Sequence, residues 1–194
     1  MDRKTNLQKY FSNYRERLFN LIDLVDINDL ESVIDVLVTA FKNGKTVYVC
    51  GNGGSAATAS HIQSDFSYFV RYFTKFRPKV RALTDNVAMI TAVGNDSSFA
   101  EIFVEQLKGH LEEDDVLICI SASGNSKNVI EAAEYANRHG GITVGFIGFT
   151  GGNLRDVCKI SLYTPNSPGD YGPIEDLHMI YDHLIVNYLS QDEE

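Results

Sequence analysis

The stretch from Thr46 to Phe69 constrains the fold of this chain more than any other, because strand, turn and helix patterns follow one another without a gap. The segment TVYVC is β-branched, aromatic or small and apolar, as a buried strand requires. The turn GNGGS follows, and its glycines tolerate positive φ and close approach of a ligand. Ser55 is expected to cap the next helix, whose free N–H groups favour anions. The stretch therefore predicts a phosphate cradle.

The helix after this turn carries two side chains that are able to do chemistry. His61 and Asp65 are four residues apart, so they share one face of the helix. An imidazole and a carboxylate on one face form a candidate acid/base pair or a pair of metal ligands. The sequence therefore places a candidate reactive pair two turns away from the predicted cradle.

A second unit of the same design lies at residues 115–139. The apolar run DVLICI predicts a strand, SASGNS predicts a turn from Ser121 to Ser126, and residues 127–139 predict a helix. Serine hydroxyls and backbone N–H groups at a helix N-terminus bind phosphate oxygens without a metal or a lysine. The chain thus carries two predicted cradles, each at the end of a strand.

The remaining sequence continues the alternation of strand and helix patterns. Strands are predicted at 46–50, 80–83, 115–120, 142–149 and 159–163, and the other helices at 3–25, 28–43, 85–96, 99–110 and 173–189. This order predicts an α/β fold, a three-layer sandwich with a mostly parallel five-stranded sheet, preceded by two N-terminal helices. We expect one domain over residues 1–194, with residues 1–44 as a helical arm that covers the sheet or another subunit.

Charge and cysteine content exclude several classes of partner. The net charge of −9 argues against nucleic acid or an anionic membrane as the main partner, but a local cradle on an acidic protein still binds a phosphorylated molecule. The three cysteines lie in or beside apolar strand patterns, which predicts reduced thiols and a cytoplasmic location. The polar N-terminus lacks the apolar core of a signal peptide, and every apolar run is too short to cross a bilayer.

Further motifs connect the two turns in a recognisable order. They are GNGGSAA before His61, RP at Arg77-Pro78, LTDN at 83–86, AVGND at 92–96 and SxSGNSxN at 121–128. In this order and spacing they resemble the sugar isomerase (SIS) family, and in more detail its bacterial phosphoheptose isomerase members. The resemblance extends over nearly the whole chain, including the two leading helices.

The resemblance implies a set of site residues. The substrate-binding positions would be Asn52, Gly53, Gly54, Ser55, Asn95, Asp96, Ser121, Ala122, Ser123, Ser126 and Glu175. A divalent metal, zinc in the family, would be bound by His61, Asp65, Glu175 and His183. Asp65 would serve as the base in proton transfer, and His183 as the acid or polarising group.

Two of these positions depart from the family pattern. Asp65 stands where the family has a longer glutamate, and Glu175 where it has a glutamine. Two histidines and two carboxylates still suit a divalent ion. The approach to the last helix, GDYGPIEDLH, lacks the arginine that is usual in the family. A substrate sugar different from the family's therefore stays an alternative. From the residues alone, both carboxylates would be surface groups, and His183 a core histidine.

The resemblance implies an aldose–ketose isomerase that converts sedoheptulose 7-phosphate to a glycero-manno-heptose 7-phosphate through an enediol, for surface polysaccharide. It also implies a homotetramer with sites at subunit interfaces. Two alternatives remain: a non-catalytic SIS regulator that binds a sugar phosphate or a replication initiator, and an isomerase of another sugar phosphate. All four metal positions keep groups able to bind a metal, which favours an enzyme.

Overall fold

The computed structural model describes residues 2–191 and contains one five-stranded sheet. The strands are β1 (Thr46–Gly51), β2 (Lys79–Ala82), β3 (Val116–Ser121), β4 (Ile142–Ile147) and β5 (Ile160–Tyr163). They lie in the order β2-β1-β3-β4-β5, and every neighbouring pair is parallel. The chain leaves β1 for β2 on one side and then returns to β3 on the other, so the topological switch point lies between β1 and β3. Ligands bind at such a point in open α/β sheets.

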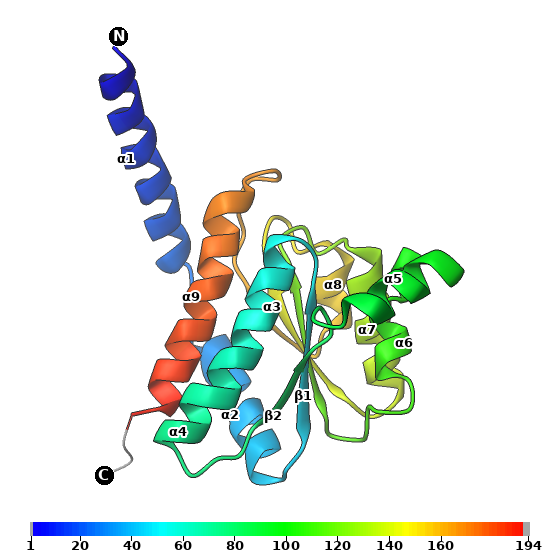
Figure 1. Cartoon of the computed structure of the whole chain (residues 1–194). Coiled ribbons are helices and arrows are strands. Elements are labelled where there is room, and N and C mark those ends of the chain that lie inside the picture. The colour runs from blue at the N-terminus through cyan, green and yellow to red at the C-terminus, as the bar shows by residue number, and fades with distance from the viewer. Residues whose placement is uncertain (1, 192–194) are drawn as a thin grey trace.

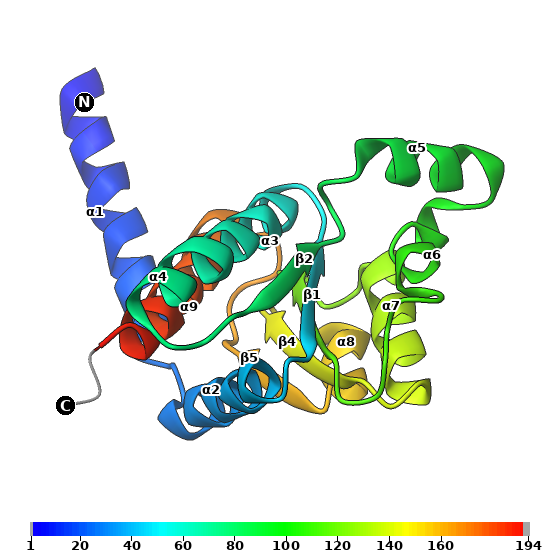
Figure 2. The same ribbon diagram turned by 60° about the horizontal axis from the view of Figure 1, so that its bottom comes forward.

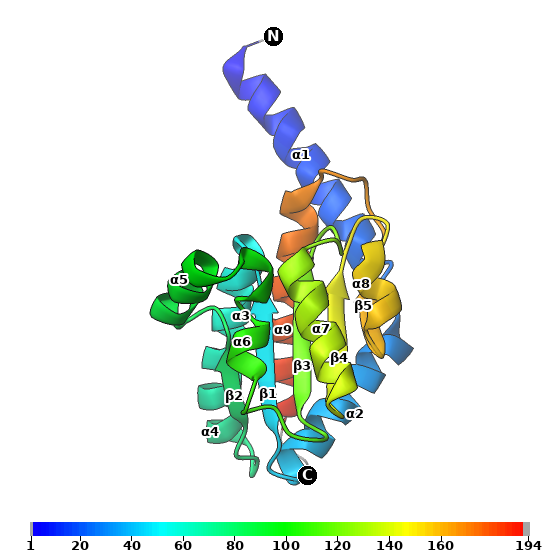
Figure 3. The same cartoon turned by 90° about the vertical axis from the view of Figure 1, so that its right-hand side faces the viewer.

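Helices cover both faces of the sheet, as Figure 3 shows. On one face lie α2 (Ile27–Lys42), α3 (Gly54–Asp65) and α9 (Tyr171–Leu189); on the other lie α6 (Val104–Leu107), α7 (Lys127–Arg138) and α8 (Gly152–Val157). Alternate residues of β1 pack into the two cores: Val47 and Val49 into the first, Tyr48 and Cys50 into the second. The predicted three-layer α/β sandwich is therefore confirmed, with a fully parallel sheet.

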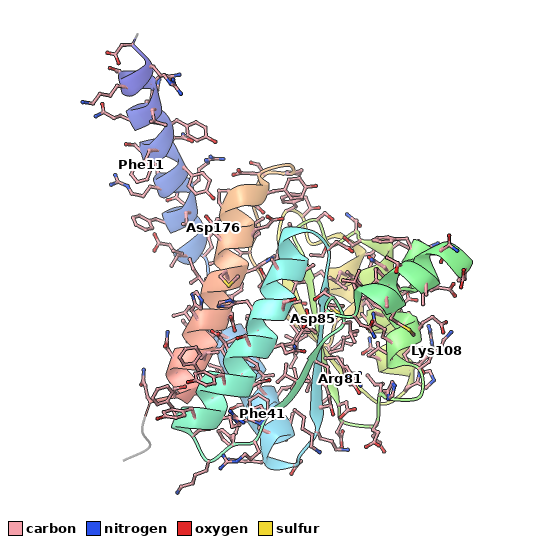
Figure 4. The ribbon with its side chains drawn as sticks, viewed as in Figure 1. Phe11, Phe41, Arg81, Asp85, Lys108 and Asp176 are labelled. Carbon is pink, nitrogen blue, oxygen red and sulfur yellow. The ribbon has the colours of Figure 1, made fainter. Side chains whose placement is uncertain are left out.

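The two N-terminal helices differ in their relation to the sheet. In α2, Val33 and Leu37 are fully buried against the sheet core. Helix α1 (Arg3–Ile22) projects from the body beside α9 and buries only Leu21 (Figure 1). Leu21 and Ile22 at its end pack on the core, and further along the helix the Tyr14 hydroxyl donates to Asp176 over 2.5 Å. Figure 4 shows Asp176 at this junction, with Phe11 further out along α1.

Three segments differ from the sequence-based predictions. Residues 99–110 form a short 3-10 helix, η2 (Phe99–Glu101), and then α6, instead of one helix. Ile102, Phe103 and Val104 are all buried, which one face of a regular helix cannot achieve. Helix α8 has no counterpart among the predicted helices. Finally, a π-helical turn, η1 (Phe66–Val70), continues α3 into α4 (Arg71–Phe73).

Within the described residues, no helix combines the length and the apolar character needed to span a membrane.

Candidate functional site

The first glycine turn connects β1 to α3. Gly53 has φ +55° and is the N-cap of α3, and its carbonyl accepts from the Ala56 and Ala57 N–H groups. The prediction that Ser55 caps this helix is therefore wrong, because the left-handed backbone of Gly53 starts the helix earlier. Ser55 is instead buried in the first turn. The turn nevertheless presents a helix N-terminus without a side-chain cap, as an anion site requires.

The second turn connects β3 to α7 and brings serine hydroxyls together. The Oγ atoms of Ser121 and Ser126 are 3.3 Å apart, and the Gly124 N–H donates to Ser121 Oγ over 3.1 Å. Ser126 is the N-cap of α7, but its side chain makes no capping bond, so its hydroxyl is available to a ligand. Ser123 Oγ accepts from the Asn125 N–H over 3.2 Å, and Ala122 is buried between these serines.

A pair of amides joins the two turns. Asn52 Nδ2 donates to Asn128 Oδ1, and Asn128 Nδ2 donates to Asn52 Oδ1, each over 2.9 Å. Asn128 is only 3% exposed, so the pair is held in place by its surroundings. Both turns thus form one rigid edge at the switch point between β1 and β3. Asn128 was part of the sequence motif but was not predicted to have this role.

Asn95 and Asp96 end helix α5 (Val87–Asp96), which stands off the sheet in Figure 2. Both residues are exposed, and Asn95 Nδ2 donates to Asp96 Oδ1 over 2.7 Å. Within residues 2–191, no hydrogen bond joins them to either turn. A role for this pair in substrate binding stays a prediction.

Helices α3 and α9 run side by side in the same direction, which sets the position of the other candidate residues (Figure 1). Glu175 contacts the start of α3, since a Cβ added to Gly54 would collide with its carboxylate. His61 is seven residues after Gly54 on α3, and Asp182 is seven residues after Glu175 on α9. His61 Nε2 lies 3.8 Å from Asp182 Oδ2. Burial, with the nearby Asp176 charge, raises the pKa of Glu175. The Glu175 carboxylate therefore lies beside the first glycine turn, whereas His61 lies two helical turns further along α3.

Four possible metal ligands meet at this second contact. They are His61, Asp65, Asp182 and His183, whose ligand atoms all lie within 4.8 Å of one another. The His61 and His183 Nε2 atoms are 3.2 Å apart, and His61 Nε2 is 3.5 Å from Asp65 Oδ2. The group borders an open cavity of about 580 Å³, which Phe69 and Phe73 also line. Two imidazoles and two carboxylates fit a divalent first-row metal.

This group differs from the predicted ligand set at one position. The structure brings His61, Asp65 and His183 together as predicted, but Glu175 is not among them, because it lies two helical turns away along α9. Asp182 was not predicted and lies in the group instead. Its burial and the charge of Asp65 raise the pKa of Asp182 to about 8. A larger cavity of about 630 Å³, between α2 and β5, contains none of the predicted site residues.

The fold and the joined cradles define a parallel α/β sandwich built to bind a small anionic ligand at its switch point. Residues 9–148 match the model of the SIS domain, and the chain therefore belongs to the SIS domain family. The expected resemblance to this family is confirmed.

Individual relatives narrow the assignment within the family. The phosphoheptose isomerase of Clostridium acetobutylicum is 36% identical over 166 residues, covering 86% of this chain and 83% of the relative. That of Aliarcobacter butzleri is 34% identical and covers 97% of this chain and 98% of the relative. A solved phosphoheptose isomerase from Francisella tularensis has a TM-score of 0.85 at 27% identity, covering 99% of this chain and 100% of that structure. These relatives place the chain in the phosphoheptose isomerase branch of the family.

Proposed function

We propose that this protein is a sugar-phosphate isomerase that converts sedoheptulose 7-phosphate into a glycero-manno-heptose 7-phosphate through an enediol. The product would supply heptose for surface polysaccharide. The similarity to phosphoheptose isomerases over nearly the full chain supports the reaction. The observation that carries the proposal is the Asn52–Asn128 pair, because it fixes two anion cradles beside each other on adjacent parallel strands.

The serine turn is the proposed anchor for the phosphate. The Ser121 and Ser126 hydroxyls lie close together at the N-terminus of α7, where three phosphate oxygens find donors and a favourable dipole. Ser123 and the Ala122 backbone border the same turn. The first turn, with Asn52, Gly53 and Gly54, then binds oxygens of the sugar. Holding the two ends of the substrate positions the reacting carbons for proton transfer.

Proton transfer between C1 and C2 of the sugar requires a base and an acid near those carbons. We assign the base to Asp65 and the acid or polarising group to His183, which lie in one group beside the open cavity. A divalent metal, zinc in our assignment, when bound at His61, Asp65 and His183 would polarise the sugar oxygens. Glu175, beside Gly54, is placed to bind a sugar hydroxyl at the first turn.

A homotetramer would bring the glycine and serine turns of one subunit to the possible metal ligands of another. Within one chain, Gly54 and His61 are seven residues apart, which is about 10 Å along a helix. In addition, α1 exposes a row of large apolar side chains: Leu7, Tyr10 and Phe11 are each at least 64% exposed. We propose that such faces meet in a homotetramer, and that the group on one subunit faces the turns of another. Light scattering of the purified protein measures this state directly.

An isomerisation assay in deuterated water tests the function. The metal-quantified protein is incubated with sedoheptulose 7-phosphate, and NMR follows the aldose product and deuterium at C2. We expect both, and we expect Ser126→Ala to raise KM about 10-fold or more, because a hydrogen bond to a charged group is lost. Ser64→Ala, at an exposed position of α3, is the matched control and should behave as the parent.

Other outcomes of this assay would favour the alternative functions. Absence of exchange from the metal-loaded protein, together with phosphate-sensitive binding of the sugar, would refute the proposed reaction. Exchange with a different ketose phosphate would then indicate an isomerase of another sugar. Binding of sugar phosphates without exchange of any of them would indicate a regulator.

A further inference from the structure

Asp182 is a buried carboxylate that lacks a hydrogen-bond partner in the described part of the chain. The residue is 0% exposed, and neither of its oxygens has a hydrogen-bond partner within residues 2–191. Asp65, which is only 8% exposed, adds a second carboxylate nearby. Burying unpaired acidic groups side by side is costly, so such groups normally bind a cation or a hydrogen-bond donor. A bound cation would offset this cost.

The spacing of the atoms around His61 is compatible with a tetrahedral metal ion. In a tetrahedral site with bonds of about 2.0–2.1 Å, neighbouring ligand atoms are about 3.3 Å apart. His61 Nε2 lies 3.2 Å from His183 Nε2, 3.5 Å from Asp65 Oδ2 and 3.8 Å from Asp182 Oδ2. These separations are close to the tetrahedral value for all three neighbours.

We propose that Asp182 is the fourth protein ligand of the divalent metal that His61, Asp65 and His183 bind in this chain, in place of Glu175. The proposal rests on the metal site of the proposed function and adds a ligand to it. Two neutral imidazoles and two carboxylates balance the charge of a divalent ion, so the filled site is neutral. Neutrality explains why a fully buried carboxylate is tolerated at this position.

Within one subunit, Glu175 is too far away to bind the same ion. Glu175 is seven residues before Asp182, about 10 Å away along α9, and its carboxylate lies against Gly54. The ion itself has a path to the site, because the His61 side chain is 42% exposed and His183 is exposed beside the open cavity. Asp182 approaches from the core side of the group, and His183 from the solvent side.

Metal affinity measured without substrate tests the proposal. Apo-protein is titrated with Zn²⁺ against a competing chelator, and with Co²⁺ followed by visible absorption. We expect Asp182→Asn to weaken binding by at least about 10-fold, since even partners outside the ligand shell contribute that much. Glu175→Ala, which removes every possible ligand atom at that position, is the control, with a change of less than about twofold. Far-ultraviolet circular dichroism verifies that each variant is folded.

A second variant places a spectroscopic reporter on the proposed ligand. Asp182→Cys should bind Co²⁺ with a thiolate-to-cobalt charge-transfer band, because a thiolate replaces a carboxylate on the ion. Glu175→Cys should bind Co²⁺ without that band. The band therefore reports contact with the metal even if Asp182→Asn folds poorly.

Three results would overturn the proposal: parental affinity in Asp182→Asn, loss of affinity in Glu175→Ala alone, or a charge-transfer band only in Glu175→Cys. All of these readouts omit the sugar phosphate. A failure of the isomerase reaction therefore leaves them unaffected, and a failure of the ligand assignment leaves the isomerase assay unaffected.

Discussion

Replacing His178 by leucine should remove a large part of the acid sensitivity of this fold. His178 lies on α9 beside the Phe146 and Tyr181 rings, and the centroid of each is 6.3 Å from that of the His178 ring. Its ring is 1% exposed, and neither ring nitrogen has a partner in the described part of the chain. Burial lowers the pKa of His178 to about 3 from an ordinary value of 6.5. The folded protein therefore keeps this ring neutral where the unfolded chain takes up a proton.

The sign and size of the effect follow from this difference. Because the folded pKa is lowered, the free energy of unfolding is unaffected well above pH 6.5 and falls as the pH decreases toward 3. With these two pKa values, the loss at pH 5 is about 2 kcal/mol relative to pH 7. His178→Leu should lack this loss. It should also be more stable at pH 7 by about 1 kcal/mol or more, since two unpaired polar atoms leave the core.

Urea unfolding at pH 7, 6 and 5 with a chelator present measures the effect, because the other titrating groups are common to both proteins. The parent and His178→Leu should diverge by about 2 kcal/mol over this range. His110→Gln, at an exposed position, is the control and should follow the parent. Parallel stability curves for the parent and His178→Leu would refute the reasoning, since they would mean that His178 finds a partner or is protonated in the fold.

Two other predictions concern the turns of the site. In a double-mutant cycle, Asn52→Ala and Asn128→Ala should each cost about 1–3 kcal/mol in urea unfolding, because the remaining amide is left unpaired; additive losses would show that the pair is not coupled. Gly124→Ala should cost more than about 3 kcal/mol, since Gly124 has φ +65° and its Cβ would collide with the Gly151 carbonyl oxygen. Gly109→Ala, at φ +75° with no atom within 4 Å, should cost only about 1–2 kcal/mol, and equal losses would contradict the steric argument.

The sheet and both turns were predictable from sequence because their signals are local. Buried parallel strands are continuous apolar runs, and each turn is marked by glycine or serine where a strand ends. The strand bounds agree with the predictions within two residues at every end. The start of α3 was misplaced because the φ of Gly53 depends on the turn as a whole. A serine in a glycine-rich turn does not reveal which residue begins the helix.

Residues 99–110 were mispredicted because tertiary packing overrides their helical pattern. The Gln106 side chain donates to the carbonyl oxygens of Leu83 and Ile102 over 2.8 and 2.9 Å, which fixes this segment to the end of β2. Three successive residues are then buried under the sheet. A pattern with a period of 3.6 residues does not include such long-range bonds. The same limit applies to the Asn52–Asn128 pair, whose partners are far apart in sequence.

Asp182 was missed for a different reason, which lies in helix geometry. Adjacent residues on a helix point about 100° apart, so a pattern search that selects His183 rejects its neighbour. In the folded chain both neighbours are nevertheless used, because α3 packs parallel to α9 and the His61 ring lies between Asp182 and His183, close to both. A seven-residue step along α3 leads from Gly54 to His61, and the same step along α9 leads from Glu175 to Asp182. Since seven residues return a helix to nearly the same face, a carboxylate that faces the first turn implies that the residue seven positions later faces His61. The contact between Glu175 and Gly54 thus shows why Asp182, and not Glu175, lies beside the histidines.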